Sequence, residues 1–263
     1  MNEIRAMLID SATRLFSEQV DAKILDAAKE DGWSAKLWEI VEEAQLPYVS
    51  VAEEAGGAGG SLSDLAAVVR IAGRNAAPVP LAETALAAWL LSESNLKIPA
   101  GPLTLAPLHG EKITARKNGA QWTLSGTAKR VPFARIAGHL VVLASSNEGD
   151  IVACVDASKC KVTPGRNLAF EPRDDVVFDN VEAVAMRDGF WAERPQLGTG
   201  SFAGDGKALT VSCVYGYVRV CEDPRQYGAF VVMYGVISPL CEYNDAMLDL
   251  GSVGYVSVSC QGS

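Results

Sequence analysis

Residues 51–74 read VAEEAGGAGGSLSDLAAVVRIAGR, with glycine at four of the five positions 56–60 and a run of helical spacing after them. A phosphate-binding loop would place a lysine and then Ser or Thr at the end of such a turn, and a dinucleotide fingerprint would follow a strand. Here Ser61-Leu62-Ser63 follows the glycines, and the preceding segment is helical in pattern through about Gln45. Phosphate binding remains the alternative. The favoured prediction is a helix-to-helix turn, in which glycine permits positive φ and close chain approach.

Residues 1 to about 96 carry apolar side chains at helical spacing, which predicts five helices. Ser34 is the predicted N-cap of the third helix, and either Ser61 or Ser63 caps the fourth. Gly73 lies near the predicted end of the fourth, where a left-handed residue is common. The helices are placed around the stripe Met7, Leu8, Ala12, Leu15 and Phe16, around Lys23–Ala28, over Trp33–Gln45, after the glycines, and from about Leu81 to Ser92.

After the segment KIPAGP, residues 97–102, the pattern changes to short strands. Asn118-Gly119 lies between two alternating runs and predicts a hairpin with a type I′ turn. The runs HLVVLAS, DIVACVD and DVVFDNV follow as further strands, so residues 101 to about 185 predict a small antiparallel β domain. Beyond about Trp191, LTVSCVYGYVRVC and GSVGYVSVSC favour strand by their β-branched residues.

These patterns predict an α+β protein with three parts. A helical domain at residues 1–98 is followed by a small antiparallel β-barrel domain at residues 101–187. Residues 190–263 form a short, atypical C-terminal segment.

Composition excludes several classes of function. The 263 residues are 49% hydrophobic, enough for a sizeable core, and the formal net charge is -9. Nucleic acid is therefore not an expected partner, because binding it needs a basic face. The N-terminus does not resemble a signal peptide, and the longest apolar run, Ala229–Ile237, is too short to span a bilayer. We expect a cytoplasmic protein with no membrane span.

The six cysteines form no CxxC pair, and the only two histidines, His109 and His139, lie far from any cysteine cluster. No metal site is therefore expected. Unpaired thiols in a reducing compartment are the favoured interpretation.

Residues 31–84, DGWSAKLWEIVEEAQLPYVSVAEEAGGAGGSLSDLAAVVRIAGRNAAPVPLAET, resemble the N-terminal helical domain of acyl-CoA dehydrogenases. In that family a Trp-bearing helix leads into a Pro-Glu-x-x-Gly-Gly-x-Gly turn, then a helix ending in a Gly-Arg step, then a proline-marked turn. The family's proline is Ala52 in this chain. The following residues 113–145 resemble the family's central β hairpin and next strand. The matching features are Trp38, Glu53–Gly59, Ala72–Arg74 and Pro78–Pro80.

The resemblance implies an FAD-dependent flavoprotein that removes hydrogens from the α and β carbons of an acyl-CoA thioester. In the family a glutamate takes the α proton, FAD accepts the β hydride, and hydrogen bonds to the thioester carbonyl stabilise the developing enolate. Electrons then pass to an electron-transfer flavoprotein. A homo- or hetero-oligomer active in fatty acid metabolism is the corresponding expectation.

Three segments correspond to the family's flavin contacts. Residues 105–111 stand where the family has Thr-Glu-Pro and Gly-Ser-Asp, and the Ser-Asp part is missing. Residues 129–134 follow the Gly-x-x-Lys strand, and residues 223–228 echo an Arg-x-Gln-Phe-Gly segment, with Pro224 at the arginine position. Lys129 and Arg130 are further candidates, as point charges for a CoA or flavin phosphate. The implied cofactor-binding residues are Leu105, Ala106, Val131, Pro132, Arg225 and Gln226.

No residue is assigned as the catalytic base. Glu222 and Glu242 are the nearest acidic candidates, and a solvated surface charge is the favoured interpretation of each. An exposed loop position is favoured for His109 over a flavin or substrate contact. Trp122, on a hairpin strand, is expected to pack in the core.

Three alternatives remain open. The chain is either an acyl-CoA dehydrogenase-like flavoprotein, with a site completed by a partner chain, or a non-catalytic, truncated member that acts as a scaffold or partner subunit. A disturbed reading frame near residue 190 would explain the change in composition. The third alternative is an unrelated α+β protein whose tail forms extra strands. If the C-terminal bundle is missing, apolar faces of the helical domain are expected to meet water unless the tail or another subunit covers them.

Overall fold

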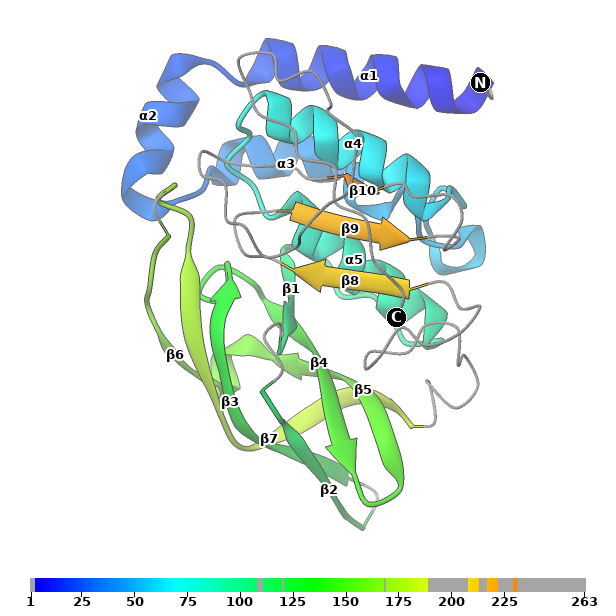
Figure 1. The fold of residues 1–263 in the computed structure, drawn as a ribbon, viewed down its shortest axis with the longest axis vertical. Helices are drawn as coiled ribbons and strands as arrows, with labels where there is room; N and C mark the ends of the chain where they lie inside the picture. Colours follow the sequence, from blue (N-terminus) through cyan, green and yellow to red (C-terminus); the bar gives the residue numbers. More distant parts are fainter. Residues whose placement is uncertain are drawn as a thin grey trace, which may run out of the picture.

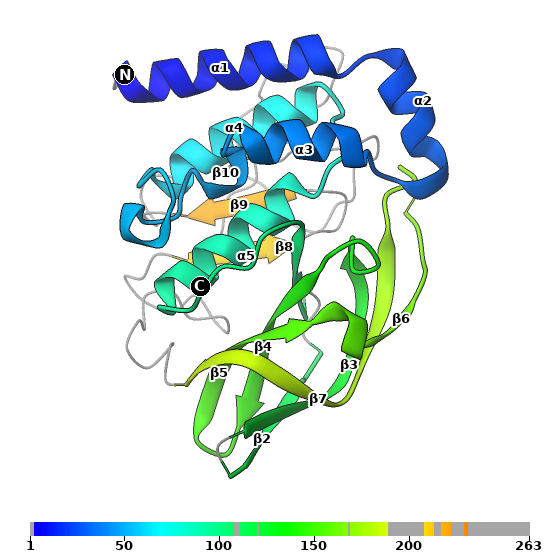
Figure 2. The same ribbon diagram turned by 180° about the vertical axis from the view of Figure 1, so that it is seen from behind.

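The computed structural model describes residues 3–107, 111–119, 121–167, 169–188, 208–212, 217–221 and 229–230 of the 263. Five helices form one layer and a closed sheet lies beneath them, which confirms the α+β prediction (Figures 1 and 2). The helices are α1 (Glu3–Gln19), α2 (Ala22–Asp31), α3 (Ala35–Glu43), α4 (Leu62–Arg74) and α5 (Leu81–Glu93).

The helix starts follow the capping chemistry of the sequence. The Ser34 hydroxyl accepts a hydrogen bond from the Leu37 amide at 3.2 Å and begins α3, as predicted. At α4 the cap is Ser61, which forms a reciprocal capping box with Asp64. The end of α4 differs from the prediction, because Gly73 lies buried inside the helix and the left-handed residue is Ala76, with φ 50°.

The glycine cluster is a structural turn between two short 3-10 helices (Leu46–Tyr48 and Glu53–Ala55) and α4. Gly56 and Gly59 have φ of 88° and 64°. A Cβ at Gly57 would strike the Val51 carbonyl oxygen, so the chains approach too closely for a side chain. The amides of all four glycines donate to carbonyl oxygens within the turn, at 2.8–3.0 Å. These amides are therefore already used and do not form a phosphate cradle.

Helix α5 is the centre of the helical layer and joins it to the barrel. Ten of its 13 residues are buried, so it is surrounded by protein on all sides. It contacts strands β1 (Leu103–Ala106), β4 (His139–Ser146) and β5 (Gly149–Asp156). The buried Thr84 hydroxyl accepts from the Leu103 amide at 3.0 Å and donates to the Leu103 carbonyl at 3.1 Å. This pair of bonds fixes α5 against the first strand.

Five strands close the barrel in the order β4, β2, β3, β7, β5, with β5 pairing back to β4. The barrel is mixed rather than wholly antiparallel, because β2 and β4 pair in parallel, as do β1 and β4 outside the ring. The chain turns back after β2 and again after β3, so β4 runs in the same direction as β2. Because these two strands are neighbours in the sheet, they pair in parallel. The remaining bounds are β2 (Thr114–Asn118), β3 (Gln121–Pro132), β6 (Lys161–Thr163) and β7 (Arg173–Asp188).

The β2–β3 hairpin is present, but its loop is shifted from the prediction. Asn118 is the last residue of β2 and pairs with Gln121, so the loop begins after Asn118 rather than at it. Gly119 takes the left-handed conformation, with φ 64°. Trp122 is 6% exposed in the barrel core, as predicted.

Alternating side chains of β4 and β5 divide between two cores. One face packs under the helices and the other fills the barrel, as the period-2 geometry of a strand requires. The helical core takes Val141, Val152 and Cys154, and the barrel core takes Leu140, Val142, Ile151, Ala153 and Val155.

A separate three-stranded sheet is formed by β8 (Ala208–Ser212), β9 (Tyr217–Cys221) and β10 (Ala229–Phe230). β8 and β9 agree with the strand prediction for LTVSCVYGYVRVC, whereas GSVGYVSVSC lies outside the described residues. β9 and β10 contact α4, so the described part of the tail lies against the helical layer. For α4, this is the exception that the prediction allowed, in which the tail covers an apolar helix face.

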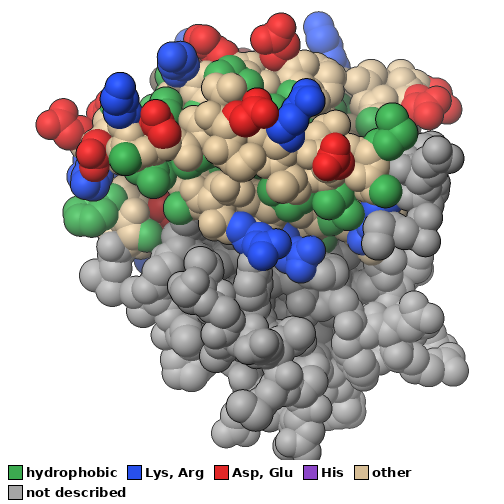
Figure 3. All heavy atoms as spheres, turned by 90° about the horizontal axis from the view of Figure 1, so that it is seen from above, with side chains coloured by type: hydrophobic (Ala, Val, Ile, Leu, Met, Phe, Trp, Pro, Cys, Tyr) green, Lys and Arg blue, Asp and Glu red, His purple; other side chains and the backbone are tan. Residues whose placement is uncertain are grey.

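The outer face of the helical layer carries both charged and hydrophobic side chains (Figure 3). Seen from above, acidic and basic side chains are interspersed over it, with hydrophobic side chains between them (Figure 3). Among the described residues, the large hydrophobic side chains that are exposed are Met7, Phe170 and Val184.

Candidate functional site

Two of the predicted flavin-binding segments meet in space, although 26 positions separate Ala106 from Pro132. They are the end of β1 and the end of β3. Thr104, with no exposed surface, donates its hydroxyl hydrogen to the Pro132 carbonyl oxygen at 2.7 Å. This bond ties the two strand ends together from inside the protein.

The side chains of the four described cofactor candidates point into the protein. Leu105 is 6% exposed and belongs to the helical core. Ala106 and Val131 are 1% and 0% exposed and belong to the barrel core, and Pro132 is also buried. These residues therefore stabilise the two strand ends by packing, and their side chains do not line a described cavity.

The end of β3 is irregular where it pairs with β7. Its register shifts between Ala128 and Val131, and Arg130 has φ 52°. The Asp175 carboxylate holds this bulge, because it accepts from the Lys129 ammonium at 2.7 Å and from the Arg130 amide at 3.1 Å. The hydrogen bond from Lys129, and then the one from the Arg130 amide, lowers the pKa of Asp175 below its usual value.

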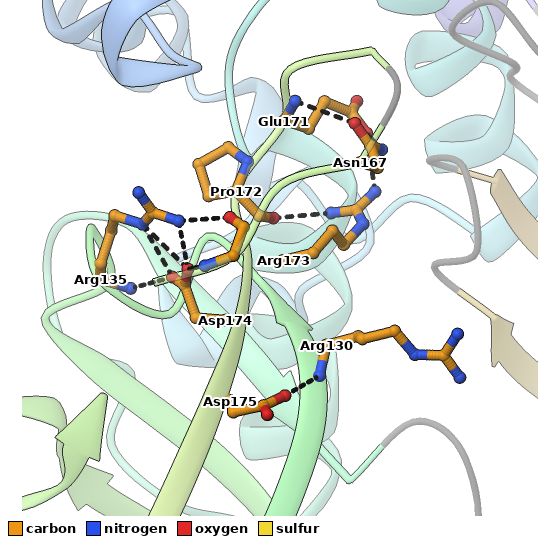
Figure 4. A network of polar contacts seen from close by, with 9 residues as sticks. Arg130, Arg135, Asn167, Glu171, Pro172, Arg173, Asp174 and Asp175 are labelled. Atoms are coloured by element: carbon orange, nitrogen blue, oxygen red, sulfur yellow. Dashed lines mark hydrogen bonds and ion pairs between the residues drawn. The ribbon is translucent and has the colours of Figure 1, made fainter. Parts of the chain in front are cut away.

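Asp174, next in the strand, is fully buried and holds the turn that follows β3 (Figure 4). It accepts from the Arg135 amide at 2.8 Å, from Arg135 Nε at 2.9 Å and from the Gly165 amide at 3.0 Å. A further bond comes from the Arg135 Nη2. Since both carboxylate oxygens accept hydrogen bonds, several of them from the positively charged Arg135, the buried charge is compensated.

A second buried ion pair holds the loop that precedes β7. Arg173 donates to Glu171 at 2.8 Å, and their side chains are 6% and 11% exposed. Asn167 donates to the same carboxylate at 2.6 Å and also accepts from the Glu171 amide at 3.0 Å (Figure 4). The Arg173 guanidinium lies 6.0 Å from the centre of the Phe133 ring, which links this loop to the turn after β3.

Sequence reasoning missed Asp174 and Asp175. The available signal was the step Arg173-Asp174-Asp175, which comes directly before the β-branched pair Val176-Val177. A doublet of carboxylates at the start of a buried strand needs partners, because an unpaired buried charge is costly. Its partners, at Lys129, Arg135 and Gly165, come from other segments and could not be identified from spacing.

Several predicted residues lie outside the described part of the chain. Arg225 and Gln226, the other two cofactor candidates, are among them. So are His109 and the acidic candidates Glu222 and Glu242. Their assignments stay predictions.

The donor chemistry of the described site fits only part of a flavin dinucleotide. The four buried candidates have no polar side-chain atom, Pro132 has no amide hydrogen, and its carbonyl is occupied by Thr104. They therefore offer packing and no side-chain hydrogen bonds to a ring system. The exposed arginine at position 130 suits the anionic, phosphate-bearing part of such a ligand.

A cavity of about 310 Å³ lies elsewhere, between α2 and the loop before β7. Its walls are mostly apolar and include Leu25, Pro78 and Phe170. Glu171 also lines it, but Arg173 and Asn167 already occupy that carboxylate. None of the four described cofactor candidates contributes to it.

Cys154 and Cys160, the two cysteines whose side chains the structure describes, do not have the character of reactive thiols. Burial raises the pKa of Cys154 to about 11, and burial together with the charge of Asp156 raises the pKa of Cys160 to about 11. Within the described ranges there is no group of three or more His, Cys, Asp or Glu side chains that could hold a metal ion. No described helix has the length and apolarity needed to cross a bilayer.

Comparison with known proteins finds similarity in the first part of the chain. Residues 2–94 match the model of the acyl-CoA dehydrogenase N-terminal domain. Acyl-CoA dehydrogenase IpdE2 of Mycolicibacterium smegmatis is 33% identical over 90 residues, which are 33% of this chain and 29% of that protein. The match agrees with the resemblance drawn from residues 31–84.

Solved structures extend the similarity across the barrel. The steroid acyl-CoA dehydrogenase Tcur3481-Tcur3483, as its G363A variant, superimposes with a TM-score of 0.63 and 28% identity, covering 72% of this chain and 58% of that one. The ChsE4-ChsE5 complex from Mycobacterium tuberculosis gives a TM-score of 0.57 at 19% identity, covering 69% of this chain and 55% of that one, which supports the fold alone. The chain thus spans less than two thirds of the relatives it matches.

Proposed function

We propose, on the premise that residues 2–94 form the N-terminal domain of the acyl-CoA dehydrogenase family, that this chain is a subunit of an FAD-dependent acyl-CoA dehydrogenase. The reaction would be α,β-dehydrogenation of an acyl-CoA thioester in fatty acid metabolism. The observation that carries the proposal is the order of parts: the matched helical layer leads directly into a five-stranded barrel, as in the 28% identical structure. Residues 1–98 and 101–187 are taken as the two domains.

In this proposal, the described residues hold and orient rather than carry out the chemistry. The bound flavin supplies the hydride acceptor. Thr104, Asp174 and Asp175 fix the ends of β1 and β3, which would present backbone groups to the cofactor. The buried apolar side chains at Leu105 and Val131 keep water out from beneath. A carboxylate base is required, and it is not assigned to a described residue.

The proposed assembly is an oligomer, because the site described here is incomplete. Two of the compared structures are named as pairs of proteins, Tcur3481-Tcur3483 and ChsE4-ChsE5. We propose that another acyl-CoA dehydrogenase-type chain, or a second copy of this one, supplies the remaining flavin and substrate contacts. An electron-transfer flavoprotein would receive the electrons, and the cytoplasm is the proposed location.

A second candidate function is a non-catalytic subunit that retains the two domains as a scaffold. One observation favours it: all four described cofactor candidates have buried, apolar side chains with no hydrogen bonds to offer. The same shape would then stabilise a partner without binding flavin.

Anaerobic addition of acyl-CoA thioesters to the FAD-loaded chain separates the two candidates. A dehydrogenase subunit is expected to bleach the flavin absorbance with one or more chain lengths, and each reaction should yield a 2-enoyl-CoA. A chain that holds flavin but is not reduced by any thioester would contradict the dehydrogenase assignment, whereas a chain that does not retain FAD at all would support the scaffold.

A further inference from the structure

Arg130 differs from the other cationic residues around the end of β3. Arg135 is bound to Asp174, Arg173 to Glu171 and Lys129 to Asp175. The Arg130 side chain is exposed, and no hydrogen bond or ion pair joins its guanidinium to another described residue. Figure 4 shows it pointing away from the Arg135–Asp174 cluster and from Asp175.

The backbone at Arg130 is held in a conformation that a side chain disfavours. Its φ of 52° lies in the left-handed region, where glycine is the usual occupant. The residue is within the register shift between Ala128 and Val131, and a bulge of this kind redirects a side chain out of the strand pattern. Strain of this kind persists where the surroundings impose it, often at ligand sites.

The surroundings impose it here through Asp175. One oxygen of that carboxylate accepts the Arg130 amide at 3.1 Å, and the other accepts the Lys129 ammonium at 2.7 Å. Lys129 is thereby neutralised, while its own amide donates to Glu111 at 3.1 Å. Of the two cations in the bulge, Arg130 is therefore the one whose side-chain donors are not bonded to another described residue and can bind a ligand.

We propose that Arg130 binds a phosphate group of an adenosine-phosphate moiety, the part that FAD and coenzyme A share. A guanidinium presents paired N–H donors that match two oxygens of a phosphate, and the fixed backbone holds it in place before the ligand arrives. The choice of nucleotide rests on the proposed function. The contact itself rests on the bulge, on the bound Asp175 and on a guanidinium that has no hydrogen-bond or ion-pair partner among the described residues.

The test is titration of the full-length chain with ADP, FAD and coenzyme A by calorimetry. Arg130→Ala is expected to weaken ADP binding about ten- to a hundredfold, because it removes hydrogen bonds to a charged group. Arg130→Lys keeps the charge but loses the paired N–H donors of the guanidinium, so its ADP affinity should lie between those of Arg130→Ala and the wild type. Arg116→Ala, an equal loss of charge at an exposed site on β2, is the matched control and should leave the affinity unchanged.

Arg130→Gly separates a ligand role from a structural one. Glycine accepts the left-handed backbone, so the variant should melt no lower than the wild type while it loses ADP affinity as the alanine variant does. If the loss of ADP affinity is accompanied by a loss for FAD and not for coenzyme A, the contact is assigned to the cofactor, and the reverse pattern assigns it to the substrate. Either result supports the phosphate contact.

Equal ADP affinity in the wild type and Arg130→Ala would overturn the inference, and so would a wild type with no saturable ADP binding. If FAD still binds equally to wild type and Arg130→Ala, the proposed function stands without this contact. If ADP binding depends on Arg130 but FAD is never retained, the contact stands and the flavin function fails.

Discussion

Adjacent aspartates at the start of β7 perform different tasks because their burial differs. Asp174 is fully buried and compensated by donors from Arg135 and Gly165. The side chain of Asp175 is 36% exposed, and its partner Lys129 is 55% exposed. Removal of one partner is severe for a buried pair and mild for a solvated one.

Asp174→Ala is therefore expected to lower the free energy of unfolding by about 3–5 kcal/mol, because it leaves donors without an acceptor. Asp175→Ala, the neighbouring control, should lower it by about 0–1 kcal/mol. Urea unfolding followed by circular dichroism measures both. Equal losses in the two variants would show that burial does not separate these residues.

The Asp175 pair also predicts a pH dependence. The hydrogen bonds from Lys129 and the Arg130 amide lower its folded pKa below the usual 3.8. The stability contributed by this group is therefore present above that usual value, and it is lost as the pH falls through the lower folded pKa. Lys129→Ala should move the pKa of Asp175 upwards, as read from the carboxyl ¹³C shift in an NMR titration. An unchanged pKa would mean that Lys129 is not the main cause.

At the scale of elements, local chemistry accounts for most of what the sequence predicted correctly. Ser34 begins α3 and a serine begins α4, because each side chain satisfies an amide only three residues away. The glycine turn was predicted for a related reason, since close chain approach is a property of the residue itself. Structural features that depend on residues only three or four positions apart can therefore be predicted from the sequence.

The choice between Ser61 and Ser63 gives an element-scale prediction. Ser61→Ala removes the bond to the Asp64 amide and breaks the capping box, so it should cost about 0.5–2 kcal/mol. Ser63→Ala, inside the first turn of α4, should change stability by less than about 0.5 kcal/mol. Thermal unfolding of the two variants is the measurement. A larger loss at Ser63 would contradict the observed cap.

Pairing between distant segments explains the errors at this scale. The hairpin loop moved by one residue because the register is set by how Trp122 and its neighbours pack in the barrel, as well as by the turn. The parallel pairing of β2 with β4 has no local signal in either strand. The hydrogen bonds that Asp174 accepts from Gly165 and Arg135 also have no local signal, because these donors lie nine and 39 positions away in the sequence.

For the whole molecule, the contact between α5 and β1 is one of the contacts that join the helices to the barrel. Thr84 makes both bonds to Leu103, and both groups are buried. This contact also fixes the position of the cofactor candidates. Leu105 and Ala106 lie on β1, and the Thr104 hydroxyl bonds the same strand to Pro132 at the end of β3.

Thr84→Val keeps the shape of the side chain but removes the hydroxyl that bonds the amide and the carbonyl of Leu103. We expect a loss of about 1–3 kcal/mol for each stranded group. Thr13→Val removes an exposed hydroxyl bond to Ile9 on α1 and is the control, with an expected change below about 0.5 kcal/mol. Hydrogen exchange should show faster exchange of β1 amides in Thr84→Val alone. Slow exchange at β1 in that variant would mean that the contact is not what couples the layers.

The central claim is that this chain is part of an acyl-CoA dehydrogenase-type flavoprotein, and flavin binding tests it most directly. The full-length chain would be incubated with excess FAD, desalted, and its visible absorption spectrum recorded. The proposed function predicts a retained, stoichiometric flavin spectrum with bands shifted from those of free FAD. A colourless protein after desalting would contradict flavin binding by this chain and would favour the scaffold function.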